Sequence, residues 1–592
     1  MKKITWNLEP VYQSAESDEY IKDKEHLTDV SELIIRELSG DAVIPKDRLK
    51  DLIDSFNTLY DTYENLDSYL YSLWTSDTSN AFVKKEINDL EKRALKMKRA
   101  LVLFRTALSD GKVDYSECKN FSFWLTEQKI QGQKQMSPSE EDLASDLQRS
   151  GAGAWERLQE RLSSVLECTW EENGPDIVRK TVTELRALAF SPERETRKKA
   201  WKLETSLWQN AEESFAASLN GIKGTSIVLD KRRGWGSPLE KSLFQNRISR
   251  LTLDSLIGVM NESLSMFRRY FKAKAKVLGI DKLSWYDLFA PVPSGEGNSG
   301  KTVWLWEETS EFIPQMFDTL SPEMGDFARK AFKSRWIDAS PASGKIGGAY
   351  CAYFPLARES RILCNYDGSF DSLSTVAHEL GHAWHGHVIS DLPAVKREYP
   401  MTLAETASIF SETLVFNAAY EKIKAGGSSA EELSVLDTYL TGASQVIVDI
   451  LSRFKFESSV FRLRGAGELS AADFTSIMLD SQQSTYGDAV DESELHGWMW
   501  AVKGHYYSAD LAFYNYPYAF GLLFALGLYS SFREKGSGFF QEYKKLLRLT
   551  GSQSAEDVAA QAGFNIESVD FWRRSVAFIE NLVSRYEFLS GK

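Results

Sequence analysis

Apolar residues recur at intervals of three and four along most of the chain, with Lys and Glu between them. This amphipathic spacing predicts helices, for example over residues 31–38, 49–71, 80–108 and 176–189. Short stretches rich in Gly, Pro and Ser interrupt the pattern, and we interpret them as loops within one large helical body. The sequence shows no repeat of fixed period. The predicted fold class is therefore mainly α.

Two short stretches, residues 347–354 and 361–366, have the β-branched and aromatic composition that is typical of strands. Both lie just before the helix that carries most of the candidate chemistry. A small β-sheet beside that helix is therefore expected.

A boundary between domains is expected near Ser191-Pro192, where one predicted helix stops before the charged run at 193–199 opens another. We therefore predict an N-terminal helical lobe over residues 1–190 and a second region over residues 191–592.

Composition excludes several classes of protein. With 592 residues, of which 43% are hydrophobic and 26% charged, the chain can bury a large core and is not intrinsically disordered. The 84 acidic residues outnumber the 70 Lys and Arg and leave a net charge of -14. This charge repels phosphate backbones and anionic lipids, so nucleic acid is not an expected partner.

The sequence also predicts no membrane partner. The longest apolar stretch, residues 519–529, is too short to span a bilayer. The first residues show no apolar run of the kind found in secretory signals. The four cysteines form no closely spaced pair. A cytoplasmic location is the simplest expectation, and the oligomeric state is left open.

Four of the seven histidines fall within residues 378–387. Apolar residues around them keep a helical spacing, and Asp371 suits the start of that helix. Residues four apart on a helix differ by about 40° in direction and about 6 Å in height, so His378 and His382 can both point at one metal ion. Zinc is the natural occupant, and Glu379 between them would lie close enough to act on a metal-bound water as general base.

Other interpretations of this cluster stay open. His378 and His382 could be core histidines of a buried helix. His385 and His387 are expected to pack rather than to bind the metal.

A catalytic zinc normally takes three protein ligands, which leaves one more to be found. Residues 402–416 are again helical in period, and they place Glu405, Ser408 and Glu412 on one face. Carboxylates among apolar residues are costly to bury unless they bind a metal or accept hydrogen bonds. From spacing alone, either glutamate could be the third ligand.

Three segments together resemble the oligoendopeptidase F group of the thimet-oligopeptidase-like zinc metallopeptidases. They are residues 378–385 (HELGHAWH), 403–408 (LAETAS) and 513–521 (FYNYPYAFG). The resemblance implies a large, two-lobed, mainly helical zincin-type metallopeptidase with a deep substrate channel. It implies one Zn²⁺ per chain, held by His378, His382 and Glu405, with Glu412 orienting a histidine.

Peptide hydrolysis builds negative charge on an oxygen, which calls for hydrogen-bond donors in addition to the metal. The resemblance implies that His505 and tyrosines of the segment 514–518 do this work. Tyr514 and Tyr518 are preferred over Tyr516.

The predicted function is a zinc-dependent endopeptidase that cleaves internal bonds of short peptides, by attack of a metal-bound water with Glu379 as general base. Two alternatives stay open at this point: a zinc hydrolase that acts on a non-peptide amide or ester, and a helical binding protein with a structural metal site.

Overall fold

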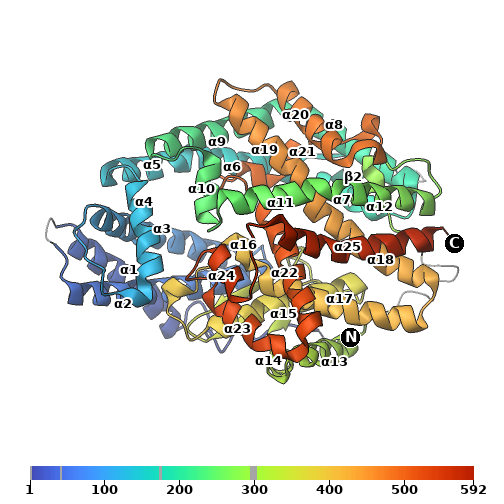
Figure 1. The fold of residues 1–592 in the computed structure, drawn as a ribbon. Coiled ribbons are helices and arrows are strands. Elements are labelled where there is room, and N and C mark those ends of the chain that lie inside the picture. Colours follow the sequence, from blue (N-terminus) through green and yellow to red (C-terminus); the bar gives the residue numbers. More distant parts are fainter. Residues whose placement is uncertain (1–2, 41–42, 172–176, 294–302, 592) are drawn as a thin grey trace. The chain divides into compact units, whose positions relative to one another are not determined.

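The computed structural model describes residues 3–40, 43–171, 177–293 and 303–591. Helices make up most of these residues, and the strands are few and short (Figure 1). The predicted mainly α fold class is confirmed. Within the described residues, no helix combines the length and the apolar character that crossing a bilayer requires.

The chain forms two compact units, each built from three separate segments. The first unit comprises Met1–Asp142, Thr302–Ala419 and Phe524–Asn565. Its elements are α1 (Asp18–Leu38), α2 (Lys46–Ser76), α3 (Ala81–Ser109), η1 (Lys119–Phe121), α4 (Ser122–Gln133), α13 (Trp306–Leu320), α14 (Pro322–Lys333), β3 (Ile337–Asp338), β4 (Tyr350–Phe354), β5 (Glu359–Leu363), α15 (Phe370–Ile389), η4 (Ala394–Lys396), α16 (Met401–Ala404), η9 (Gly536–Phe539), α23 (Phe540–Leu549) and α24 (Ala555–Gln561).

The second unit comprises Leu143–Lys301, Tyr420–Leu523 and Ile566–Lys592. Its elements are α6 (Ala152–Val165), β1 (Glu167–Glu171), β2 (Ile177–Thr181), α7 (Val182–Ala187), η2 (Leu188–Phe190), α8 (Arg194–Asn210), α9 (Glu212–Arg232), α10 (Pro238–Gln245), α11 (Arg250–Glu262), α12 (Leu264–Val277), η3 (Trp285–Asp287), α18 (Ser429–Ser444), η5 (Gln445–Asp449), α19 (Ile450–Arg464), α20 (Ala471–Tyr486), η6 (Gly487–Ala489), η7 (Glu492–Glu494), α21 (Met499–Val502), η8 (Gly504–Tyr507) and α25 (Val569–Ser590).

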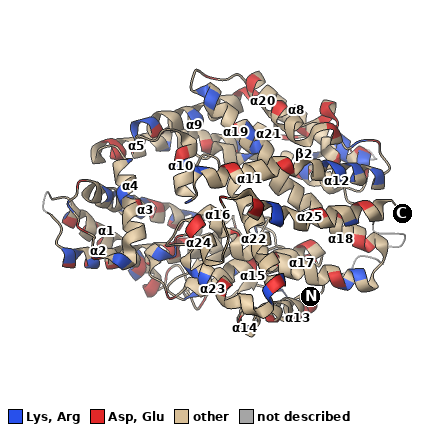
Figure 2. Ribbon diagram, in the orientation of Figure 1, with Lys and Arg blue, Asp and Glu red and all other residues tan. Residues whose placement is uncertain are grey.

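Three of the five boundaries between the units fall inside helices, namely α5 (Pro138–Ser150), α17 (Thr406–Gly426) and α22 (Tyr516–Lys535). The boundary predicted between residues 190 and 191 lies within the second unit, between η2 and α8. The division of the chain into regions 1–190 and 191–592 stays a prediction from the sequence. Lys and Arg are interspersed with Asp and Glu along the helices of both units (Figure 2).

The first unit contains a three-stranded sheet in the order β3-β5-β4. Strands β4 and β5 are antiparallel, with Cys351 opposite Ile362, whereas β3 and β5 are parallel. Helix α15 packs on β4 and β5, and α2 packs on β4. The expected small sheet beside the histidine helix is therefore present, and β4 is one of its edges.

One segment of the second unit differs in secondary structure from the prediction made from the sequence. The helix predicted over residues 176–189 is wrong over residues 177–181, because β2 pairs there with β1 in antiparallel register, and residue 176 lies outside the described residues. Val178 and Thr181 are β-branched and suit a strand. Helix α7 begins only after Thr181, whose hydroxyl accepts from the backbone N–H of Glu184 while the Glu184 carboxylate accepts from the backbone N–H of Thr181.

Candidate active site

Helix α15 carries the His-Glu-x-x-His sequence. Its N-cap is Ser369, whose hydroxyl accepts from the backbone N–H of Ser372, and Asp371 lies in the first turn. Both features suit a helix N-terminus, where a side-chain oxygen satisfies a free N–H and negative charge is favourable. The rings of His378 and His382 follow one turn apart on one face, with centroids 4.9 Å apart.

Helix α17 lies unusually close to α15 because Gly381 has no side chain. A Cβ at Gly381 would lie 2.5 Å from the carbonyl oxygen of Ala407 and 2.6 Å from the Cα of Ser408. The predicted helix over residues 402–416 is interrupted at Glu405, which separates α16 from α17 at φ -83° and ψ 3°. This bridge conformation is frequent at active sites. The close approach brings the Glu405 carboxylate to both histidines.

One oxygen of Glu405 faces both imidazoles. Glu405 Oε2 lies 3.2 Å from His378 Nε2 and 3.4 Å from His382 Nε2. Ligand atoms about 2.0–2.1 Å from a tetrahedral zinc lie about 3.3 Å from one another. Among the residues that the structure describes, these three are the group whose ligand atoms lie within 4.8 Å of one another. Two imidazoles and a carboxylate are a donor set that suits zinc, so the residues fit the metal.

Electrostatics in this group favour a bound cation. Burial opposes ionisation of Glu405, but hydrogen bonds to His378 and His382 outweigh it and hold the pKa of Glu405 well below its ordinary range. Burial likewise acts to lower the pKa of His378, yet its bonds to Glu405 and then Glu412 raise that pKa well above the ordinary value. A carboxylate held ionised beside two imidazoles attracts positive charge.

Three polar side chains hold the group in place. Glu412 Oε2 lies 3.0 Å from His378 Nδ1, so this ring nitrogen can donate to it and leave Nε2 directed at Glu405. Ser374, one turn before His378, donates to the other oxygen of Glu412 at 3.2 Å. Ser408 donates to Glu405 Oε2 at 2.6 Å. Ser374 was not among the predicted site residues, although its place four residues before His378 puts it on the same face of the helix.

Glu379 is buried, with 6% of its surface exposed, and its Oε2 has no hydrogen-bond partner in the described structure. Desolvation raises the pKa of Glu379, and this effect exceeds the opposing influence of His382 and His378. A buried carboxylate oxygen without a donor is costly. It marks a place where a further donor, such as a water or a substrate amide, belongs.

His385 and His387 pack, as the sequence suggested. His385 is fully buried, stacks on Tyr399 with ring centroids 4.3 Å apart, and bonds through Nε2 to the hydroxyl of Thr550 at 2.9 Å. Burial lowers the pKa of His385 to about 3, so this ring is neutral. His387 packs against the rings of Phe327 and Trp384.

The other three predicted catalytic residues lie in the second unit and lie together. The His505 ring stacks on Tyr514, with centroids 4.5 Å apart, and lies 6.1 Å from the ring of Tyr518. His505 Nδ1 is 2.9 Å from Asn515 Oδ1. The contact with Asn515 was not predicted from the sequence.

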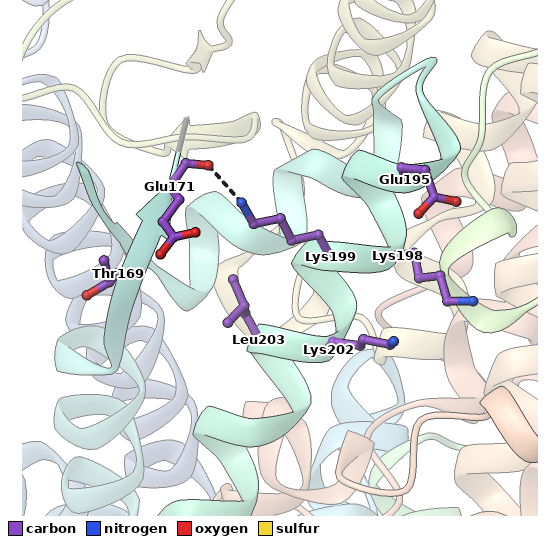
Figure 3. A pocket seen from close by; sticks show the side chains of 7 residues that line it. All are labelled: Thr169, Glu171, Glu195, Lys198, Lys199, Lys202 and Leu203. Carbon is purple, nitrogen blue, oxygen red and sulfur yellow. Dashed lines mark hydrogen bonds between the residues drawn. The ribbon is translucent and has the colours of Figure 1, made fainter. Parts of the chain in front are cut away.

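The second unit also has a surface hollow between β1 and α8, of about 690 Å³ (Figure 3). Its lining residues are Thr169, Glu171, Glu195, Lys198, Lys199, Lys202 and Leu203. Lys199 donates to the backbone oxygen of Glu171, and Lys198 pairs with Glu494. None of the predicted site residues lines this hollow.

The helical fold, the His-Glu-x-x-His sequence of α15 and the Glu405 carboxylate between α16 and α17 are the features of a metalloendopeptidase. Residues 309–578 match the family model described as peptidase family M3. This part of the chain is therefore similar to that metallopeptidase family, and the predicted resemblance is confirmed.

Named oligopeptidases are similar to this chain in sequence. The chain is 24% identical to oligopeptidase PepF of Bacillus subtilis over 607 aligned positions, which cover 99% of this chain and 87% of that protein. It is 24% identical to an oligoendopeptidase F homolog of Lactococcus lactis over 424 positions, which cover 71% of this chain and 69% of that protein.

Solved structures share the fold. A peptidase structure from Chlamydophila abortus matches with a TM-score of 0.81 at 19% identity and covers 99% of this chain and 98% of that one. Oligoendopeptidase F from Enterococcus faecium matches with a TM-score of 0.72 at 18% identity, over 96% of this chain and 98% of that one.

Proposed function

We propose that this protein is a zinc-dependent endopeptidase that hydrolyses internal bonds of short oligopeptides. The observation that carries the proposal is the convergence of His378 Nε2, His382 Nε2 and Glu405 Oε2 at the spacing of a tetrahedral metal site. The match to peptidase family M3 and the oligoendopeptidase F relatives support oligopeptides as the substrate class.

His378, His382 and Glu405 would hold one zinc ion per chain. When bound, zinc polarises a carbonyl and lowers the pKa of a coordinated water. Glu412 accepts the Nδ1 proton of His378 and thereby keeps Nε2 free to act as a ligand. Ser408 donates to Glu405 and restrains the rotation of its carboxylate.

Glu379 is the general base. Its carboxylate takes a proton from the attacking water and then delivers it to the nitrogen of the leaving amine. Its unpartnered Oε2 supports this role, because the oxygen is available to accept that proton. The burial of Glu379 excludes bulk water from the transfer.

The remaining groups act on the peptide. His505, Tyr514 and Tyr518 would contact the peptide near the scissile bond, and the tyrosine hydroxyls would donate to the oxygen on which charge develops. The edge strand β4, which lies against α15, can pair with an extended substrate by β-addition.

The test is the variant Glu379→Gln, assayed for metal content and for cleavage of an internally quenched peptide. We expect one zinc per chain and a loss of turnover of about 10²- to 10⁴-fold, because the amide cannot take up the proton. Glu311→Gln on the exposed face of α13 is the matched control and should behave like the unmodified protein. Near-normal turnover of Glu379→Gln would remove Glu379 from the base role. Failure of the loaded protein to cut any internal peptide bond would refute the proposed activity.

A further inference from the structure

A buried chain of polar groups in the second unit leads to His505. Asp449, the last residue of the π-helical turn η5, forms an ion pair with Arg453 on α19. Arg453 Nη1 lies 3.1 Å from Asn515 Oδ1, and the same oxygen lies 2.9 Å from His505 Nδ1. Asn515 is 2% exposed, and Asp449 is also buried.

Arginine determines which way the Asn515 amide points. A guanidinium group has only donors, so the amide atom facing Arg453 must be the oxygen. Within the part of the chain that the structure describes, Asn515 Nδ2 is buried without a partner in the present orientation. A rotated amide would place this NH₂ group directly against the guanidinium, so that two donors face each other and Arg453 Nη1 loses its acceptor. The contact with Arg453 therefore fixes the amide orientation by chemistry.

The amide orientation in turn determines the proton position on His505. Because Asn515 Oδ1 can only accept, the hydrogen bond requires a proton on His505 Nδ1. A neutral imidazole carries one proton, which leaves a lone pair on Nε2. Burial lowers the pKa of His505, an effect that the hydrogen bond to Asn515 opposes and the charges of Arg453 and Lys503 reinforce. The ring is thus neutral at pH 7.

The backbone bends at Phe513, just before the residue that bonds to His505. Phe513 has a positive φ of 56°, which is rare for a bulky residue. Its ring is held against Phe454 and Phe461, with centroids 5.6 Å and 5.4 Å apart. Directly after this bend, Tyr514 stacks on His505 and Asn515 bonds to its edge. Strained backbone persists where the surrounding packing enforces it, often at functional sites.

We propose that Arg453 and Asn515 are positioning residues that hold His505 as the Nδ1–H tautomer, so that its Nε2 accepts a hydrogen bond from a backbone N–H of the bound peptide. Among the described residues, the hydrogen bond of the His505 ring runs through Nδ1 to Asn515, and the ring is only half-buried. A lone pair cannot stabilise a developing oxyanion, so that role falls to the tyrosine hydroxyls. The substrate contact rests on the proposed function, whereas the tautomer does not.

The tautomer is tested by long-range ¹H–¹⁵N NMR of protein labelled with ¹⁵N-histidine. Seven histidines give a tractable spectrum, and His505→Gln identifies the signal of His505. We expect a protonated Nδ1 and an unprotonated Nε2. In Asn515→Leu the signal should change to a mixture of tautomers, whereas Asn515→Asp, which keeps an acceptor oxygen, should retain the Nδ1–H form. An Nε2–H tautomer in the unmodified protein would overturn the proposal.

Kinetics on a quenched peptide test the substrate contact. Asn515→Leu should raise KM about tenfold with a smaller change in kcat, because a bond made to the ground state is lost. Asn515→Asp should stay within about twofold of the unmodified protein. Arg453→Lys, which keeps the positive charge but not the fork of donors, is a second variant and should raise KM in the same direction.

A matched control removes another buried hydrogen bond from the same segment. Tyr516→Phe loses the bonds of the phenol to the backbone oxygen and the hydroxyl of Ser242, and the Tyr516 hydroxyl makes no bond to His505. It should leave both the tautomer and KM unchanged. Equal effects of Tyr516→Phe and Asn515→Leu would show a merely structural role and refute the proposal. A protein with the Nδ1–H form that cuts no peptide would refute the proposed function and the substrate contact, and would support the tautomer assignment.

Discussion

The close approach of α15 and α17 at Gly381 can be tested with one methyl group. In Gly381→Ala the new Cβ would lie 2.5 Å from the oxygen of Ala407 and 2.6 Å from the Cα of Ser408, both of them backbone atoms. Since ordinary contacts begin at 3.4 Å, α17 must move away by about 0.9 Å.

A shift of this size acts on the metal site. The oxygen of Glu405 now lies 3.2 Å and 3.4 Å from the two histidine nitrogens. If these separations grow to about 4 Å, the three atoms can no longer all lie about 2.0–2.1 Å from one tetrahedral ion. We expect zinc affinity to fall by about 10- to 100-fold, which is the typical loss when the groups that orient metal ligands are disturbed. Overpacking should also cost about 1–3 kcal/mol of stability.

Zinc affinity is measured by competition with a chromophoric chelator, and stability by the urea midpoint of the metal-free protein. Gly258→Ala in α11 is the control, because a Cβ there meets nothing within 4 Å. It should leave metal binding unchanged and stabilise the helix by up to about 1 kcal/mol. Zinc affinity of Gly381→Ala within twofold of the unmodified protein would refute the reasoning that this contact sets the ligand spacing.

Two further predictions concern the same unit. Glu405→Ala should lose stoichiometric zinc, whereas Glu412→Ala should retain it with affinity reduced about 10- to 100-fold; the opposite order in a metal assay would exchange their roles. His385 should make the fold sensitive to acid. The pKa of His385 is about 3 in the folded protein and 6.5 in an unfolded chain. Because the unfolded chain takes up the proton first, the free energy of unfolding falls as the pH drops below 6.5. By pH 5 this loss is about 2 kcal/mol. His385→Phe should reduce the difference between the urea midpoints at pH 8 and pH 5, and an unchanged difference would contradict the assignment. Thr550 keeps its own bond to the oxygen of Leu547 in that variant.

Sequence patterns predicted the helical class, the sheet beside α15 and the chemistry of that helix. They failed over residues 177–181, where the helical spacing of apolar residues also fits a strand followed by a short helix. Pairing with β1 decides that segment, and pairing is a contact between distant parts of a chain.

What the sequence by itself determined is local. His378, Glu379 and His382 lie within five residues of one helix, so helix geometry alone sets their relative directions. Tertiary structure decided the rest. Spacing allowed either Glu405 or Glu412 as the third ligand, and only the packing of α17 on α15 puts Glu405 at the two Nε2 atoms and Glu412 at Nδ1 of His378. The proton on His505 likewise depends on an arginine 52 residues earlier in the chain, which no local pattern can place.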